Sequence, residues 1–207
     1  MRNKPVPWWA VLSSACAPVL LIGGWQLAAT RQLGGFAPMS QTISALAGRG
    51  ATDRWIMTTA LVGVGACHGI TAVGFAPAAV VGRLLLGAGG AATVALAAFP
   101  LSVTGESSVH MASASVAFTT LSLWPALAWR RHGTPGHRSS VVAACGLLTL
   151  LSWFGIEYLS GSPRIGLSER VLAGAQALWP LAAVLLARRS ECHAAAFASS
   201  GMGGDQI

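Results

Sequence analysis

The sequence predicts an all-α protein, a polytopic helical bundle that crosses a membrane about six times. Of its 207 residues, 54% are hydrophobic and only 9% are charged, whereas about 25% of a typical soluble domain is charged. The hydrophobic residues lie in long runs of about 20 residues, which is the length that a transmembrane helix needs. Short clusters of basic residues follow the ends of these runs, as in membrane proteins.

Six spanning helices are expected, in the order 8–29, 55–75, 79–100, 110–129, 140–159 and 168–187. The first run follows a basic start, but it is too long for a signal peptide and is interpreted as a retained helix. The second and third helices are joined by a very short connection around Pro77, so they should be antiparallel neighbours. Gly65 and Gly69 form a GxxxG pair that favours close packing against the glycine-rich third helix.

The long first loop, 30–54, should fold back over the outer face as a short helix that begins near Ser40. Ile43 and Leu46 would be its apolar contacts. Residues 1–189 are expected to form one membrane domain. The small, polar and Gly-rich stretch 190–207 should be a disordered cytoplasmic tail.

Orientation follows from the distribution of lysine and arginine, which are enriched in cytoplasmic segments. An inner N-terminus places more basic residues inside than outside, so both termini are predicted to be cytoplasmic. The inner set is Arg2, Lys4, Arg83, Arg130, Arg131, Arg138, Arg188 and Arg189; the outer set is Arg31, Arg49, Arg54, Arg164 and Arg170. The net charge of +7 is scattered among these positions, which excludes a nucleic-acid surface.

No metal and no cofactor are expected. The four cysteines have neither a CxxC spacing nor a zinc-type Cys/His spacing. An outer metal would need His110 with carboxylates such as Glu106, Glu157 or Asp53, which is a disfavoured set. Haem between His68 and His110 is disfavoured because the two histidines are predicted at different depths.

The candidate catalytic residues are His110, Glu106 and Glu157. Glu106 and His110 are four residues apart, so they share a face if the fourth helix begins early. Glu157 lies in the last turn of the fifth helix, where the helix dipole disfavours an anion, and it should have a basic partner, Arg164 or Arg170. An outer salt-bridge network without catalysis explains the same residues.

Candidate ligand-binding residues are His68, Ser44, Asp53, Tyr158, Arg164 and Arg170. His68 lies deep in the second helix, and ionisable groups at such depth are functional candidates. A neutral histidine that is hydrogen-bonded to a neighbouring helix is the competing interpretation. Glu169, in the first turn of the sixth helix, is explained by dipole complementarity alone.

Two segments resemble the DUF998 family of prokaryotic six-helix membrane proteins, whose function is undefined. PMSQTISALAGRGATDRW (38–55) is similar to the family's "tISdLg" region, and FPLSVTGESSVHMASASVAF (99–118) to a Phe-Pro, polar loop and His pattern. Ser44, Pro100 and His110 match these motifs without a known role. Ala45, Leu101 and Ser102 depart from the family pattern, and Ala45 stands where an acid is expected, so a carboxylate-based site is not implied. The resemblance implies a multi-pass protein of a bacterial plasma membrane.

The leading functional hypothesis is a non-enzymatic membrane protein with an outward-facing polar pocket for a lipid or small amphiphile, or a partner subunit. Membrane lipids, a second copy or another membrane protein would then be its partners. The alternative is an enzyme or transporter that uses Glu106, His110 and Glu157 at the outer face. An electron-transfer protein would be coloured when purified.

Overall fold

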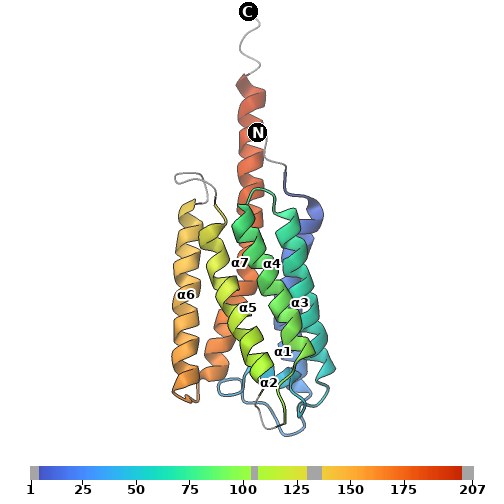
Figure 1. The fold of residues 1–207 in the computed structure, drawn as a ribbon. Helices are drawn as coiled ribbons and strands as arrows, with labels where there is room; N and C mark the ends of the chain where they lie inside the picture. The colour runs from blue at the N-terminus through green and yellow to red at the C-terminus, as the bar shows by residue number, and fades with distance from the viewer. Residues whose placement is uncertain (1–4, 104–106, 130–136, 202–207) are drawn as a thin grey trace, which may run out of the picture.

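The computed structural model describes residues 5–103, 107–129 and 137–201, and it forms an antiparallel bundle of long helices (Figure 1). All regular elements of these residues are helices, which confirms the predicted fold class. The elements are α1 Trp8–Thr30, α2 Ile43–Ala47, α3 Trp55–Gly74, α4 Val80–Ala98, α5 Ser108–Leu127, α6 His137–Leu159 and α7 Ile165–Gly201.

Five of these helices are long and apolar enough to cross a membrane, namely α1, α3, α4, α6 and residues Ile165–Cys192 of α7. The chain is therefore a multi-pass membrane protein. α5 is rich in serine and threonine and falls outside this set, so the sixth crossing stays a prediction. It lies between α4 and α6 in the bundle and runs alongside both (Figure 1).

The predicted helix boundaries lie within about three residues of those observed, except at the end of the chain. The sequence predicted a disordered tail from residue 190, but α7 is helical to Gly201. Its 37 residues give a length of about 55 Å at 1.5 Å per residue, against a hydrocarbon core of about 30 Å. α7 accordingly projects beyond the other helices (Figure 1). Residues 202–207 of the predicted tail lie outside the described residues.

Backbone contact between α3 and α4 sets their spacing. A Cβ atom added at Gly90 would lie 2.6 Å from the carbonyl oxygen of Gly65 and 3.2 Å from the backbone nitrogen of Gly69. Nothing lies within 4 Å of a Cβ added at Gly69, so Gly65 and Gly90 make the close approach. The prediction of antiparallel neighbours is confirmed, and small residues allow the contact.

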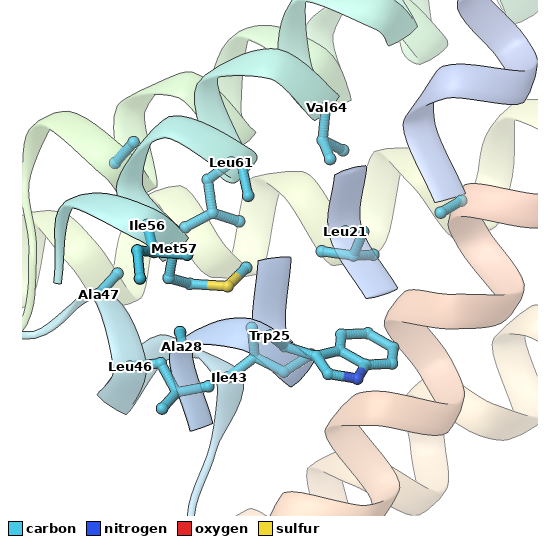
Figure 2. Close-up of a cluster of buried hydrophobic side chains, with 13 residues drawn as sticks. Leu21, Trp25, Ala28, Ile43, Leu46, Ala47, Ile56, Met57, Leu61 and Val64 are labelled. Atoms are coloured by element: carbon cyan, nitrogen blue, oxygen red, sulfur yellow. The ribbon is translucent and has the colours of Figure 1, made fainter. Parts of the chain in front are cut away.

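The long loop between α1 and α3 folds under one end of the bundle, here called the α2 end (Figure 1). Thr42 begins α2, because its hydroxyl accepts a hydrogen bond from the Ala45 N–H at 3.2 Å. Ile43 and Leu46 are buried against Trp25 of α1 and Met57 of α3 (Figure 2). The predicted short helix and its apolar contacts are confirmed, with a start at Ile43 rather than near Ser40.

α6 lies at the edge of the bundle and has few buried side chains, namely Ser140, Ala144, Leu147 and Glu157. Gly146 and Gly155 on this helix have no neighbouring atom within 4 Å of an added Cβ. Unfilled space therefore borders α6, and one region of this space is lined in part by polar residues.

Candidate functional site

A cavity of about 470 Å³ lies between α5 and α6 at the α2 end, and we call it the lateral cavity. Tyr158 and Leu159 on its wall are 47% and 85% exposed, so it opens on the side of the bundle that would face lipid. Its lining residues are Thr42, Ser44, Leu101, His110, Met111, Ala114, Ser115, Phe118, Thr119, Leu151, Phe154, Gly155, Tyr158, Leu159 and Glu169.

A smaller cavity of about 50 Å³ lies on the bundle axis, and we call it the central chamber. Ser44, Phe118 and Glu169 line both spaces, so the chamber lies directly behind the inner wall of the lateral cavity. Its deeper polar residues are His68, Thr93 and Gln176, each at least 94% buried. Polar side chains at this depth in a membrane protein are costly and mark functional candidates.

Glu169 is the central acid of this arrangement, and it is only 3% exposed. Its carboxylate accepts hydrogen bonds from the Ile43 backbone N–H and from the Ser44 hydroxyl, the latter at 3.1 Å. Both donors belong to α2, so Glu169 fastens the short helix to α7. Dipole complementarity within α7 does not describe this role, because the partners are on another element.

Arg170, a predicted ligand-binding residue, holds the same loop through backbone carbonyls. Its Nη1 donates to the oxygens of Pro38, Gln41 and Gly166 at 2.7–2.8 Å. Its guanidinium carbon lies 5.0 Å from the centre of the Phe36 ring, which is a cation–π distance. Arg170 is therefore a clamp on the loop, and it does not line either cavity.

His110 lines the lateral cavity and is 2% exposed. Its Nδ1 lies 2.9 Å from the carbonyl oxygen of Phe99. Because a carbonyl can only accept, Nδ1 is the protonated nitrogen, and Nε2 is left as an acceptor. The imidazole ties the first turn of α5 to the end of α4.

Glu157 does not join His110 at the cavity. It pairs with Arg164 at 3.2 Å and accepts a hydrogen bond from the Trp153 indole at 2.9 Å, and it lines neither space. The predicted Arg164 partner is confirmed, and Arg170 is bound elsewhere. Glu106 lies outside the described residues, so the predicted catalytic group of three is not assembled in the described part of the chain.

The other predicted ligand-binding residues are divided between the cavities and the surface. Ser44 and His68 are in the chamber, and Tyr158 lines the lateral cavity with its hydroxyl 3.9 Å from the Met111 sulfur. Asp53 is an exposed turn residue with a φ of 49°. Arg164 is also at the surface, with a side chain that is 64% exposed.

His68 differs from the expected hydrogen-bonded histidine. It is 1% exposed, and its Nδ1 has no hydrogen-bond partner among the described residues. A buried imidazole nitrogen without a partner is unfavourable. A residue that lines the chamber thus carries an unsatisfied ring nitrogen.

Within the described ranges, no three His, Cys, Asp or Glu side chains come together as metal ligands. The chemistry that these residues offer is hydrogen bonding and one buried carboxyl group beside an apolar space. This combination suits an amphiphile, with its polar end at Glu169 and its apolar part between α5 and α6.

Comparison with known families gives a match to a model described as "Protein of unknown function (DUF998)" over residues 9–186. The chain belongs to the DUF998 family. The match covers every membrane-spanning helix almost completely, so the DUF998 region includes both cavities. No curated protein and no solved structure matches this DUF998 chain.

Sequence analysis missed Glu169 and Gln176 as site residues of this DUF998 protein. Gln176 donates to the Phe118 carbonyl at 2.8 Å and to the Ser122 hydroxyl at 2.9 Å, both through Nε2. A glutamine in the middle of the apolar run 168–187 was a usable signal, because such residues are costly in lipid. The role of Glu169 depends on a partner 126 residues away, which no local pattern indicates.

Proposed function

We propose that this DUF998 protein binds a lipid or small amphiphile in the lateral cavity. The supporting observation is the cavity itself, which is about 470 Å³ in volume, opens between α5 and α6 and has a buried carboxylate on its inner wall. Ligand sites are commonly apolar spaces of roughly 300–1,000 Å³ with a few polar groups that orient the ligand. An amphiphile enters such a space from the surrounding bilayer without crossing water.

The proposal places the chain in a bacterial plasma membrane with both termini in the cytoplasm. The α2 end, and with it the lateral cavity, then faces outward, because the smaller set of basic residues lies there. Membrane lipids supply the ligand. A second copy or another membrane protein as partner is a further proposal, in which the chain acts as a subunit.

The alternative function, an enzyme or transporter, would use Glu106, His110 and Glu157. Of these, His110 lines the cavity, whereas Glu157 is engaged with Arg164 and Trp153. Amphiphile binding needs no such catalytic group, and it uses the polar residues that do line the cavity. We therefore favour binding over catalysis.

Gly155→Leu tests the proposal, because Gly155 lines the lateral cavity and its added Cβ would meet no atom within 4 Å. The leucine fills ligand space without a clash in the free protein. Overpacking of a filled site costs about 1–3 kcal/mol, so amphiphile affinity should fall about tenfold. The measurement is the lipid retained after purification, by mass spectrometry.

Gly23→Leu is the matched control, since an added Cβ on α1 also meets nothing within 4 Å and Gly23 lines neither cavity. It should retain the wild-type lipid. Gly146→Leu fills the separate apolar groove between α6 and α7 and should behave like Gly23→Leu. Equal lipid retention in Gly155→Leu and wild type would contradict the proposal.

A further inference from the structure

Among the described residues, one acid lines the lateral cavity. Glu169 is the only residue of this lining, as far as the described part of the chain shows it, that is acidic or permanently charged. Within the described ranges, no cation lies at ion-pair distance from this carboxylate; the neighbouring Arg170 attracts it only from a longer distance and donates its hydrogen bonds to backbone carbonyls. A carboxylate has about four acceptor positions, and the Ile43 N–H, the Ser44 hydroxyl and the Ser44 N–H use three. Glu169 can therefore bind a further donor.

Three aromatic side chains line the lateral cavity together with this carboxylate. The centres of the Phe118 and Phe154 rings are 5.2 Å apart, and those of Phe154 and Tyr158 are 6.4 Å apart. All three residues line the lateral cavity, and Phe118 also lines the chamber with Glu169. A carboxylate together with aromatic faces is a chemistry that attracts cations. The site therefore favours a positive head group over a neutral or negative one.

The central chamber adds acceptors and thereby selects among cations. With its proton on Nε2, His68 presents the unpartnered Nδ1 as an acceptor. Gln176 uses Nε2 for both of its hydrogen bonds, which leaves Oε1 as a second acceptor. A primary ammonium group has three N–H donors for such a set, whereas a quaternary ammonium has none. The chamber, at about 50 Å³, admits a small head group and not a chain.

We infer that the amphiphile of this DUF998 protein carries a primary ammonium head, which binds at Glu169 and the chamber behind it. Its hydrocarbon chain lies in the lateral cavity between α5 and α6. The inference rests on the proposed amphiphile function and names the class of its ligand. A lipid with an amine head group and a free long-chain amine share this chemistry.

The test compares three probes with the same chain, dodecylamine, dodecan-1-ol and dodecyltrimethylammonium. The full-length protein is held in phosphatidylcholine nanodiscs, and probe occupancy is measured by native mass spectrometry. Glu169→Gln should weaken dodecylamine binding about tenfold to a hundredfold, since it removes a charged hydrogen bond. Dodecan-1-ol binding should not change. Because all variants are held in nanodiscs of the same composition, the amount of probe that partitions into the lipid is the same for each and does not affect the comparison.

Glu157→Gln is the matched control, because it removes the same charge from a carboxylate outside both cavities. It should leave dodecylamine binding at the wild-type level. An equal loss in both variants, or no loss in Glu169→Gln, overturns the inference. If Glu169→Gln fails to fold, the affinities of the wild-type protein for the three probes are compared instead. Dodecyltrimethylammonium or dodecan-1-ol binding as tightly as dodecylamine then overturns the inference.

Gly155→Leu separates failure of this inference from failure of the proposed function. If dodecylamine and dodecan-1-ol bind equally well and Gly155→Leu abolishes the binding of both, the lateral cavity is an amphiphile site without amine selectivity. Probe binding that is unaffected by Gly155→Leu removes the site itself. Displacement of bound dodecylamine by lysophosphatidylethanolamine assigns the ammonium to a lipid head group, and no displacement by this lipid assigns it to a free amine. Equal competition by lysophosphatidylcholine overturns the inference.

Discussion

At the scale of single residues, two glutamates with similar sequence surroundings have different environments. Glu157 and Glu169 both lie at a helix end beside an arginine in the sequence neighbourhood. Glu157 is 4% exposed and pairs with the largely exposed Arg164, outside both cavities. Glu169 is 3% exposed, is bound by groups on α2 and lines both cavities. Both carboxylates are buried, so their partners and the adjoining space, which the sequence does not give, distinguish the two residues.

His110→Ala should show how much His110, a residue that matches the family motif, contributes to stability. The variant loses the bond from Nδ1 to the Phe99 carbonyl, so unfolding should become easier by about 1–2 kcal/mol. Amphiphile retention should be reduced but not abolished, because Glu169 and the apolar lining of the lateral cavity remain. Thermal unfolding of the purified protein and its bound lipid are the two measurements.

His110→Asn is the conservative comparison, because its amide N–H can replace the Nδ1 donor. It should recover part of the lost stability. A His110→Ala protein that is as stable as wild type and still binds its ligand, but no longer converts or transports it, would favour the enzyme or transporter alternative instead.

At the scale of elements, the helices could be predicted because each one follows from a local pattern. A hydrophobic run of sufficient length gave five spanning helices and their order, and Ile43 with Leu46 indicated α2. α5 was placed correctly, although its serines and threonines weaken the membrane signal. The Gly65–Gly90 contact could only be expected in general terms, since the sequence does not say which of the glycines of α4 meets α3.

Gly90→Ala should destabilise the pair α3 and α4. The added Cβ would meet the Gly65 carbonyl oxygen at 2.6 Å, and backbone atoms cannot move aside as a flexible side chain does. A cost of about 3 kcal/mol is expected, despite the gain in helix propensity of about 1 kcal/mol. Thermal unfolding in a fixed detergent measures the effect.

Gly87→Ala on the same helix is the matched control. Its added Cβ meets only the Ala72 side chain, at an ordinary 3.7 Å, and it has the same propensity gain. The variant should be as stable as wild type or slightly more stable. Equal melting temperatures for the two variants would show that the α3–α4 approach is looser than described.

At the scale of the whole molecule, the fold class was predictable and the site was not. Composition and run length determine that the chain is a helical membrane bundle. The lateral cavity lies beside α6, which has few buried side chains, and the chamber combines residues from α1, α2, α3, α4, α5 and α7. Such juxtapositions depend on packing between distant segments, for which a single sequence has no periodic signal.

The predicted orientation can be tested with cysteine labelling in intact cells. In a variant without the other cysteines, native Cys192, which is exposed near the end of the apolar part of α7, should react with an impermeant maleimide only after permeabilisation. Gly50→Cys, in the exposed loop at the α2 end, should react from outside. The reverse pattern would place the lateral cavity on the cytoplasmic side.

The attachment of α2 to α7 also has a consequence in time. Ile43 and Ser44 are synthesised 126 and 125 residues before Glu169, and translation proceeds at about 5–20 residues per second. On the order of ten seconds therefore pass before the N–H of Ile43 can meet its partner. During that interval the first loop cannot be attached to α7, so the insertion of the last helix completes the folding of this loop. A nascent chain without α7 would present the α2 end of the cavities, still open, to the translocation machinery.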